Sequence, residues 1–348
     1  ALAVASSSEI SIYSIDSLDV IQTIEPQTAY PDIAISPDGN RMFLTSSSVQ
    51  VWDLGTGQLL DRLGYIEGGI RSCAISANGR TLAIAGPAWP GGGDPDYKLE
   101  IIEIATGRRI YSVQQYGHIN FVAVDPSGLL VASSGERGLE IFDGQAGKIL
   151  QTIRSENLPI AFDANGILVH GTEMGSVPVR LWDARSGELK LTLDDGFGSP
   201  IFSSDRKWLA LWIRKGVIQI RDASTYQLVQ TLANNGTEIS DAAFSPNGKT
   251  LAVVTQDGLA IWDITSGQIT NSLTGFTPPI ESVTFSYDSN LILGGIGDSL
   301  ADVWDIGSST SLSINTAYEH SPSIRVQSPN GQIRAEEWID DATHPLTR

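Results

Sequence analysis

One recurring phrase constrains the fold of this chain more than any other feature. An apolar run ends in Trp-Asp or a variant of it, turns through Thr-Gly or Ser-Gly, and becomes apolar again. The phrase reads VQVWDLGTGQLL at 49–60, VRLWDARSGELK at 179–190, GLAIWDITSGQI at 258–269 and LADVWDIGSSTSL at 300–312. The residues at the tryptophan position are Tyr13, Trp52, Ile102, Phe142, Trp182, Arg221, Trp262 and Trp304. Their spacing of about 40 residues shows that the sequence is built of repeats.

One step in this series is longer than the others. It separates Trp52 from Ile102 and exceeds the common period by about ten residues. The excess coincides with an insertion, GPAWPGGGDPDYK, at residues 86–98. Its glycines and prolines predict a loop.

Each repeat carries three turn signals between short apolar runs. AFSPNGKTLAV places Asn247-Gly248 between alternating apolar residues, and AISPDGNRMFL does the same with Asp38-Gly39. Such dipeptides tolerate positive φ angles, so they predict two-residue type I′ hairpins. A second turn, such as QDG at 256–258, precedes the Trp-Asp run, and the Thr-Gly or Ser-Gly turn follows it. Three turns joining four short strands predict an all-β chain, and few stretches show the helical period.

A period near 40 residues with a Trp-Asp phrase resembles the WD40 repeat, and the resemblance covers nearly the whole chain. It implies a β-propeller of four-stranded antiparallel blades arranged radially. Many WD40 blades carry Gly-His before the first strand, whereas here only Gly117-His118 matches. Because of these departures, and of phrases such as LAVASS and ISPDG, the chain resembles a divergent bacterial WD40 or YVTN-like propeller.

Eight third strands predict eight blades, with seven as the alternative because WD40 propellers most often have seven. The N-terminal unit lacks a first strand, whereas the C-terminal stretch SIRVQSPNGQ supplies one. We expect residues 324–326 to pair with residues 1–5, which closes the ring and protects edge strands. The propeller then spans residues 1–334, and residues 335–348 form a tail or short cap. Because the sequence opens in mid-strand, we expect the natural chain to begin upstream.

Charge and composition argue against several classes of function. A formal net charge of −18 disfavours nucleic acid and anionic membrane surfaces, which attract basic groups. No apolar run reaches the roughly 20 residues of a membrane helix, so membrane insertion is not expected. A single cysteine, Cys73, excludes an internal disulfide and a cysteine metal cluster.

No catalytic residue, metal site or cofactor is predicted. The four histidines lie in distant repeats without metal-ligand spacing. GDSL at 297–300 spells a serine-esterase signature, but it falls in a turn between two strands, so we interpret it as a coincidence.

The insertion is the main candidate binding element. Trp89 and Tyr97 are aromatic residues of the kind that dominate interface energetics. Asp94 and Asp96 are residues of the type that ligates Ca²⁺, but two carboxylates do not make a metal site. The alternative is that Trp89 folds back onto the ring. The resemblance places other loops between second and third strands on the same face, and these add Glu173, Met174, Arg214 and Lys215.

The repeat that contains Arg221 is unusual in another way. Arg221 occupies the tryptophan position, and we expect it to stack on an aromatic ring or to pair with a carboxylate. Arg206 and Lys207 precede the same repeat's second strand, in a turn on the opposite face from Arg214 and Lys215.

Three classes of function remain open. The leading hypothesis is a non-catalytic scaffold that binds a protein partner or a cell-surface ligand through one face. The alternatives are a hydrolase or lyase with carboxylates at the central channel, and a self-assembling structural protein. The resemblance and the acidic composition favour an extracytoplasmic or cell-surface location in a bacterium, with the cytoplasm as the alternative.

Overall fold

The computed structural model describes most of the chain. The described residues are 2–5, 10–13, 20–24, 32–36, 40–88, 96–154, 159–170, 178–193, 197–213, 216–233, 237–273, 280–286, 288–296, 300–308 and 310–311. Every regular element within them is a β-strand. Within these ranges no helix is long and apolar enough to cross a membrane.

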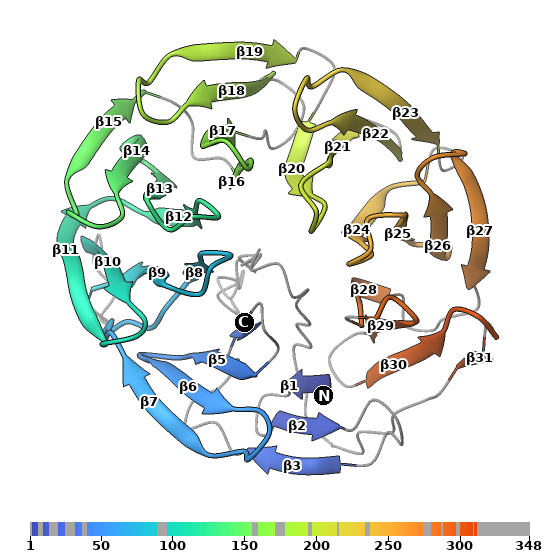
Figure 1. The fold of residues 1–348 in the computed structure, drawn as a ribbon, viewed down its shortest axis with the longest axis horizontal. Helices are drawn as coiled ribbons and strands as arrows, with labels where there is room; N and C mark the ends of the chain where they lie inside the picture. Colours follow the sequence, from blue (N-terminus) through green and yellow to red (C-terminus); the bar gives the residue numbers. More distant parts are fainter. Residues whose placement is uncertain are drawn as a thin grey trace, which may run out of the picture.

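The strands form antiparallel sheets arranged radially around a centre (Figure 1). In seven of these sheets four strands follow one another in chain order from the centre to the rim. The first strands are β4 (Asp32–Ile35), β8 (Ser72–Ile75), β12 (Ile119–Val124), β16 (Ile160–Phe162), β20 (Phe197–Phe202), β24 (Ile239–Phe244) and β28 (Ile280–Phe285). The second strands are β5 (Arg41–Thr45), β9 (Thr81–Pro87), β13 (Leu130–Gly135), β17 (Ile167–His170), β21 (Trp208–Ile213), β25 (Thr250–Thr255) and β29 (Leu291–Ile296).

The third and fourth strands complete these seven blades. The third strands are β6 (Val49–Asp53), β10 (Asp96–Glu103), β14 (Gly138–Asp143), β18 (Val179–Asp183), β22 (Val217–Asp222), β26 (Gly258–Asp263) and β30 (Leu300–Asp305). The fourth strands are β7 (Leu59–Leu63), β11 (Arg108–Tyr116), β15 (Ile149–Ile153), β19 (Leu189–Leu193), β23 (Leu228–Ala233), β27 (Gln268–Leu273) and β31 (Thr310–Ser311). The Trp-Asp phrase therefore ends the third strand of a blade, as predicted.

The blade count differs from the expected eight. Seven sheets contain four strands, which is the alternative count, whereas β1 (Leu2–Ala5), β2 (Ile10–Tyr13) and β3 (Val20–Ile24) form a sheet of three strands. This sheet lies between the first and the last four-stranded blades in Figure 1. The predicted closing strand at 324–326 and the tail at 335–348 lie outside the described residues.

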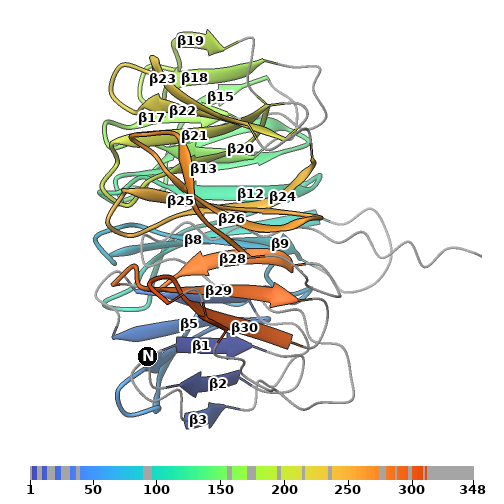
Figure 2. The same cartoon turned by 90° about the vertical axis from the view of Figure 1, so that its right-hand side faces the viewer.

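The strands run along the axis of the ring, as the side view in Figure 2 shows. Because consecutive strands are antiparallel, the connections after first and third strands lie on one side of the ring, which we call the turn face. The connections after second and fourth strands lie on the other side, which we call the loop face.

In the blade formed by β24 to β27, the hairpin between the first and second strands is closed by a serine side chain. Ser245 Oγ accepts a hydrogen bond from the backbone nitrogen of Thr250 (3.0 Å), and the Gly248 nitrogen donates to the Ser245 carbonyl (2.9 Å). This second bond, with serine first, proline second and glycine fourth, is typical of a type I turn. Gly248 has φ +68°, whereas Asn247 is not among the described non-glycine residues with positive φ. The predicted type I′ turn, which requires positive φ at both central residues, is therefore wrong.

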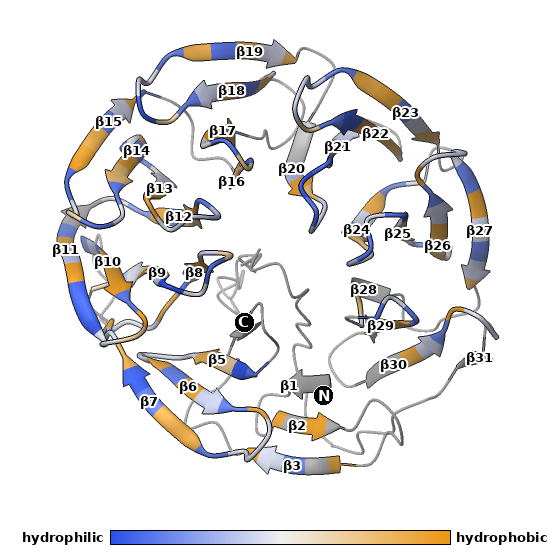
Figure 3. Cartoon of the chain, viewed as in Figure 1, coloured by the Kyte–Doolittle hydropathy of each residue, from blue (hydrophilic) through white to orange (hydrophobic). Residues whose placement is uncertain are grey.

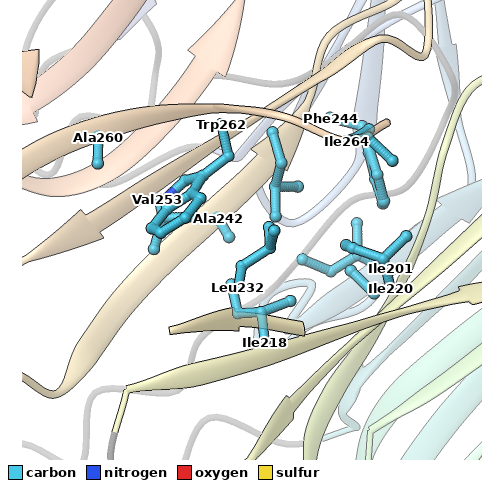
Figure 4. Close-up of a cluster of buried hydrophobic side chains, with 12 residues drawn as sticks. Ile201, Ile218, Ile220, Leu232, Ala242, Phe244, Val253, Ala260, Trp262 and Ile264 are labelled. Carbon is cyan, nitrogen blue, oxygen red and sulfur yellow. The ribbon is translucent and has the colours of Figure 1, made fainter. Parts of the chain in front are cut away.

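The hydrophobic core lies between neighbouring blades. In the cluster of Figure 4, Ile218, Ile220 and Leu232 of one blade pack against Phe244 and Trp262 of the next. The fourth strands are more polar and more exposed, as predicted, and Figure 3 shows hydrophilic and hydrophobic residues side by side along β23 and β27. Stability therefore comes from apolar packing between blades.

Candidate binding face

The insertion extends one blade at the loop face. The strands β9, β10 and β11 that flank it have 7, 8 and 9 residues, whereas the corresponding strands of the neighbouring blade, β5 to β7, have 5 each. The backbone nitrogen of Ala88 donates to the Asp96 carbonyl (2.7 Å), so the ladder continues to the described edge of the insertion. The base of the insertion is thus a β-hairpin in register.

Six of the eight residues predicted for binding lie outside the described part of the chain. These are Trp89, Asp94, Glu173, Met174, Arg214 and Lys215. The remaining two, Asp96 and Tyr97, begin strand β10.

Tyr97 is buried, with 3% of its surface exposed. Its ring packs in a cluster with Leu99 and Ile119, and it lies 4.8 Å from the His118 ring, centroid to centroid. On a strand, alternate residues face the same side, so Tyr97 joins Leu99 and Ile101 in the packing between blades. The expectation of an exposed aromatic anchor is corrected for Tyr97, which contributes to the core.

Asp96 is exposed, and its Oδ2 accepts a hydrogen bond from Gln114 Nε2 (3.1 Å). The pairing of β10 with β11 places these two residues on adjacent strands. Within the described residues, no group of three or more His, Cys, Asp or Glu side chains gathers where it could hold a metal ion.

A buried carboxylate anchors the base of the insertion, and the sequence analysis missed it. Glu100 is fully buried, and its Oε1 lies 2.7 Å from Lys98 Nζ and 2.9 Å from Arg109 Nη1. Its Oε2 accepts from the backbone nitrogen of Tyr65 (3.3 Å). Lys98 Nζ also donates to the Tyr65 carbonyl (2.7 Å). This network ties the insertion hairpin to the connection between β7 and β8.

The spacing of Lys98 and Glu100 could have revealed part of this network. Two residues apart on a strand, they face the same side and can pair. Nothing in the sequence, however, indicates which backbone groups of the preceding blade they meet.

The network leaves an aromatic side chain at the surface. Tyr65 is 56% exposed, although its backbone is held by Glu100 and Lys98. On the neighbouring blade, His118 Nε2 lies 3.8 Å from Glu136 Oε1, and both side chains are partly exposed. Tyr65, Asp96, His118 and Glu136, together with the insertion, define what we call the candidate binding face.

Arg221 is buried and hydrogen-bonded. Its Nε and Nη2 donate to Gln219 Oε1 (2.9 and 2.6 Å), and its Nη1 donates to the Tyr226 carbonyl (2.9 Å). In the blade formed by β4 to β7, Trp52 Nε1 similarly donates to Gln50 Oε1 (3.1 Å), two residues earlier on its strand. The guanidinium therefore occupies the place of the indole and, like Trp52, donates to a glutamine two residues earlier.

The carboxylates of the repeated phrase serve turns. Asp263 Oδ1 accepts from the nitrogen and the hydroxyl of Ser266, and these bonds hold the pKa of its carboxyl below the usual value. In Asp222, hydrogen bonds from Ser224 and Thr225 lower the pKa to about 2. Similar bonds lower the pKa of Asp53, Asp183 and Asp305. A lowered pKa suits a permanently ionised turn residue and not a general acid.

Comparison with protein families supports the repeat assignment. The model of the anaphase-promoting complex subunit 4 WD40 domain matches residues 201–288. The WD repeat-containing protein SL1-17 of Schistosoma mansoni is 28% identical over 156 residues, which is 43% of this chain and 50% of that protein. Protein tipD of Dictyostelium discoideum is 26% identical over 247 residues, 65% of this chain and 38% of that protein. The chain thus spans half or less of the length of these relatives.

A relative from Synechocystis is also found. The uncharacterized WD repeat-containing protein sll1491 of that organism is 32% identical over 106 residues, 30% of each chain. Most of the similar curated proteins are eukaryotic, so the bacterial type expected from the sequence is not confirmed.

Solved structures share the fold at low sequence identity. The computationally designed Ika8 protein superposes with a TM-score of 0.68 and 20% identity over 87% of this chain and 92% of that one. The Cps50 (Swd1) β-propeller domain of Myceliophteria thermophila gives a TM-score of 0.59 and 18% identity over 79% and 95%. The repeated phrase, the radial sheets and these comparisons together support the assignment of this chain as a WD40-repeat β-propeller.

Proposed function

We propose that this propeller is a non-catalytic scaffold that binds a protein partner through the candidate binding face. The observation that carries the proposal is the anchored insertion hairpin. Glu100, Lys98 and Arg109 fix its base, so the strands that the connection at 89–95 joins are held in place. A support that is already ordered lowers the entropic cost of binding. The matching family model describes a domain from a subunit of a multi-protein complex, which agrees with a role in assembly.

The partner contacts Tyr65 and Trp89 in this proposal. An exposed tyrosine supplies apolar area and a hydroxyl at low conformational cost, which is why tyrosine is enriched at interfaces. Asp94, Asp96, Glu173, Met174, Arg214 and Lys215 are proposed to surround these anchors on the same face, which accommodates a protein surface or a cell-surface ligand of mixed charge. An extracytoplasmic or cell-surface location remains part of the proposal.

The test is proximity cross-linking in the source organism with wild-type protein and two variants. One variant replaces residues 89–95 with a short Gly-Asn turn, and the other carries Tyr65→Ala. We expect both to lose the same cross-linked protein while keeping the wild-type melting temperature. Lys207→Ala, on the turn face, is the control and should retain the partner. A partner retained by both variants, or lost equally by the control, contradicts the proposal.

We also propose that residues 324–326 pair with β1 and so close the ring. Among the described strands β1 has no inner neighbour of the kind that β5 and its equivalents have, and SPNG at 328–331 repeats the hairpin signal of Ser245–Gly248. Ile324→Pro should lower the melting temperature, because proline removes a ladder hydrogen bond. Thr347→Pro, in the predicted tail, should not. Equal melting temperatures for the two variants argue against this closure.

A further inference from the structure

At two of the described boundaries, β8–β12 and β24–β28, neighbouring blades share a hydrogen bond between their first strands, which we call the first-strand link. Ser72 Oγ on β8 accepts from the backbone nitrogen of Val122 on β12 (3.1 Å). Asp241 Oδ2 on β24 accepts from the nitrogen of Val283 on β28 (2.9 Å). The two links share one register relative to the side chains that close the hairpin turns. Each acceptor lies four residues before the closing side chain of its own blade, which is Ser76 or Ser245. Each donor lies three residues before the closing side chain of the next blade, which is Asp125 or Ser286.

This link cannot form between β16 and β20. Pro159 occupies the acceptor position, four residues before Asp163, and Pro200 occupies the donor position, three residues before Ser203. Proline has no backbone N–H, and its side chain accepts no hydrogen bond. The boundary between the β16–β19 and β20–β23 blades therefore lacks both the acceptor and the donor of the first-strand link.

Two other side chains bridge this boundary on the turn face. Tyr226 Oη donates to Asp163 Oδ2 (2.8 Å), and Arg206 Nη1 donates to the Phe162 carbonyl (2.8 Å). The Arg206 guanidinium also lies over the Phe202 ring, 5.7 Å from its centroid. Tyr226 and Arg206 belong to the β20–β23 blade, and their acceptors belong to the blade before it.

Both bridging residues adopt a backbone conformation that favours glycine. Tyr226 and Arg206 each have φ +58°, whereas the equivalent residues of the next blade are Gly267 (φ +66°) and Gly248 (φ +68°). A left-handed conformation is unfavourable for a residue with a side chain, because its Cβ crowds the following carbonyl oxygen. Such strain persists where the surrounding contacts outweigh it.

We propose that Tyr226 and Arg206, bound to Asp163 and the Phe162 carbonyl, form an inter-blade clamp that replaces the missing first-strand link and keeps the ring closed at this boundary. Asp163 can close its own turn and also accept from Tyr226, because its carboxylate has two oxygens. Oδ1 closes its own turn by accepting from the backbone nitrogens of Asn165 and Ile167 (2.7 Å each), and Oδ2 accepts from the Tyr226 hydroxyl (2.8 Å) and from Asn165 Nδ2 (3.3 Å). Burial and the neighbouring Asp163 charge raise the pKa of Tyr226, so its hydroxyl keeps the proton that it donates.

Tyr226→Phe tests the clamp because it keeps the ring and removes only the donor. We expect the unfolding equilibrium constant to rise about tenfold, as for loss of a hydrogen bond to a charged group. Amide hydrogen exchange should accelerate in β16, β17, β20 and β21 but not in β24 or β28. Tyr65→Phe, which alters an exposed tyrosine, is the control. If the two variants are equally stable, or if exchange accelerates equally in all blades, the clamp is overturned.

A rescue experiment separates the clamp from a general packing effect. Pro159→Ser with Pro200→Val introduces the residue types that form the first-strand link between β8 and β12. In the Tyr226→Phe background this pair should recover most of the lost stability, whereas in wild type it should add little. An equal effect in both backgrounds, or no recovery, overturns the replacement. Tyr226→Gly completes the test: a gain in stability from relieved strain shows that the hydroxyl bond does not outweigh the strain and overturns the proposal.

Discussion

Asp263 Oδ1 lies 2.7 Å from the backbone nitrogen of Ser266 and 2.8 Å from the Ser266 hydroxyl. The pairs Asp53 with Thr56 and Asp305 with Ser308 repeat this arrangement in other blades. The aspartate of the repeated phrase therefore folds the chain from the third strand into the fourth.

Removing this carboxylate should weaken one turn without disturbing the core. Asp263→Ala should lower the free energy of unfolding by about 1 kcal/mol, a value reduced from that of a buried charged hydrogen bond because the group is partly exposed. Denaturant titration measures it. Asp61→Ala, on an exposed strand position, is the matched control and should change stability by less than about 0.5 kcal/mol. Equal losses in the two variants would contradict the assigned role.

Stability should fall at acid pH because several of these turn carboxylates have lowered pKa values. A carboxyl whose folded pKa lies below its unfolded value stabilises the fold above the unfolded pKa, and this contribution is lost as pH falls through the folded pKa. Asp222, with a pKa of about 2, and Asp263 set the window from about pH 4 down to about 2. Melting curves from pH 7 to 2 should show this decline, and carbon NMR of Asp222 should report its low pKa directly. A midpoint for Asp222 near 4 would refute the assigned hydrogen bonds.

The Glu100 carboxylate should matter more than any exposed acid of the same strand. Glu100→Ala removes the buried acceptor shared by Lys98, Arg109 and the Tyr65 nitrogen and should cost about 2 kcal/mol, as for loss of hydrogen bonds to a charged group. Glu103→Ala, three residues along, loses only an exposed pair with Arg108 and an exposed turn bond from Thr106, and should shift the denaturation midpoint much less than Glu100→Ala. Chemical denaturation distinguishes the two. Proteolysis of the 89–95 connection should also accelerate in Glu100→Ala alone if this network supports the insertion.

Two leucines of β23 should differ in how much their truncation destabilises the protein. Leu232 is 2% exposed within the inter-blade core, whereas Leu228 is 49% exposed on the rim. Leu232→Ala should cost about 3 kcal/mol through lost packing and a residual cavity. Leu228→Ala should change stability by less than about 0.5 kcal/mol. Comparable losses for both would mean that the rim residue is covered in solution.

The order of the strands could be predicted because its signals are local. Turn residues and alternating apolar residues act within about ten residues of the chain, so the third strand that contains Trp262 and the polar fourth strand after it could be placed without coordinates. The turn type could not, because Asn-Gly permits positive φ at both residues but does not require it. The Ser245 side chain binds the backbone nitrogen of Thr250 and stabilises a type I turn, in which Gly248 has a positive φ.

The candidate site was predictable in part. The insertion follows from the broken period, and its extra length is visible in β9 to β11. The burial of Tyr97 was not predictable, because it depends on which side of β10 faces the next blade and on His118 being there to meet it. Glu100 was missed for the same reason: its partners include the Tyr65 backbone of the preceding blade.

Four-stranded units in series can be predicted from local sequence, because hydrophobic period and turn chemistry are properties of neighbouring residues. How one unit meets the next depends on contacts between residues far apart in the chain. Tyr226 reaches Asp163 across 63 positions of the chain, and Arg206 reaches the Phe162 carbonyl across 44. Such contacts depend on the angle and distance between blades, which arise when their apolar faces pack together and which no local pattern encodes.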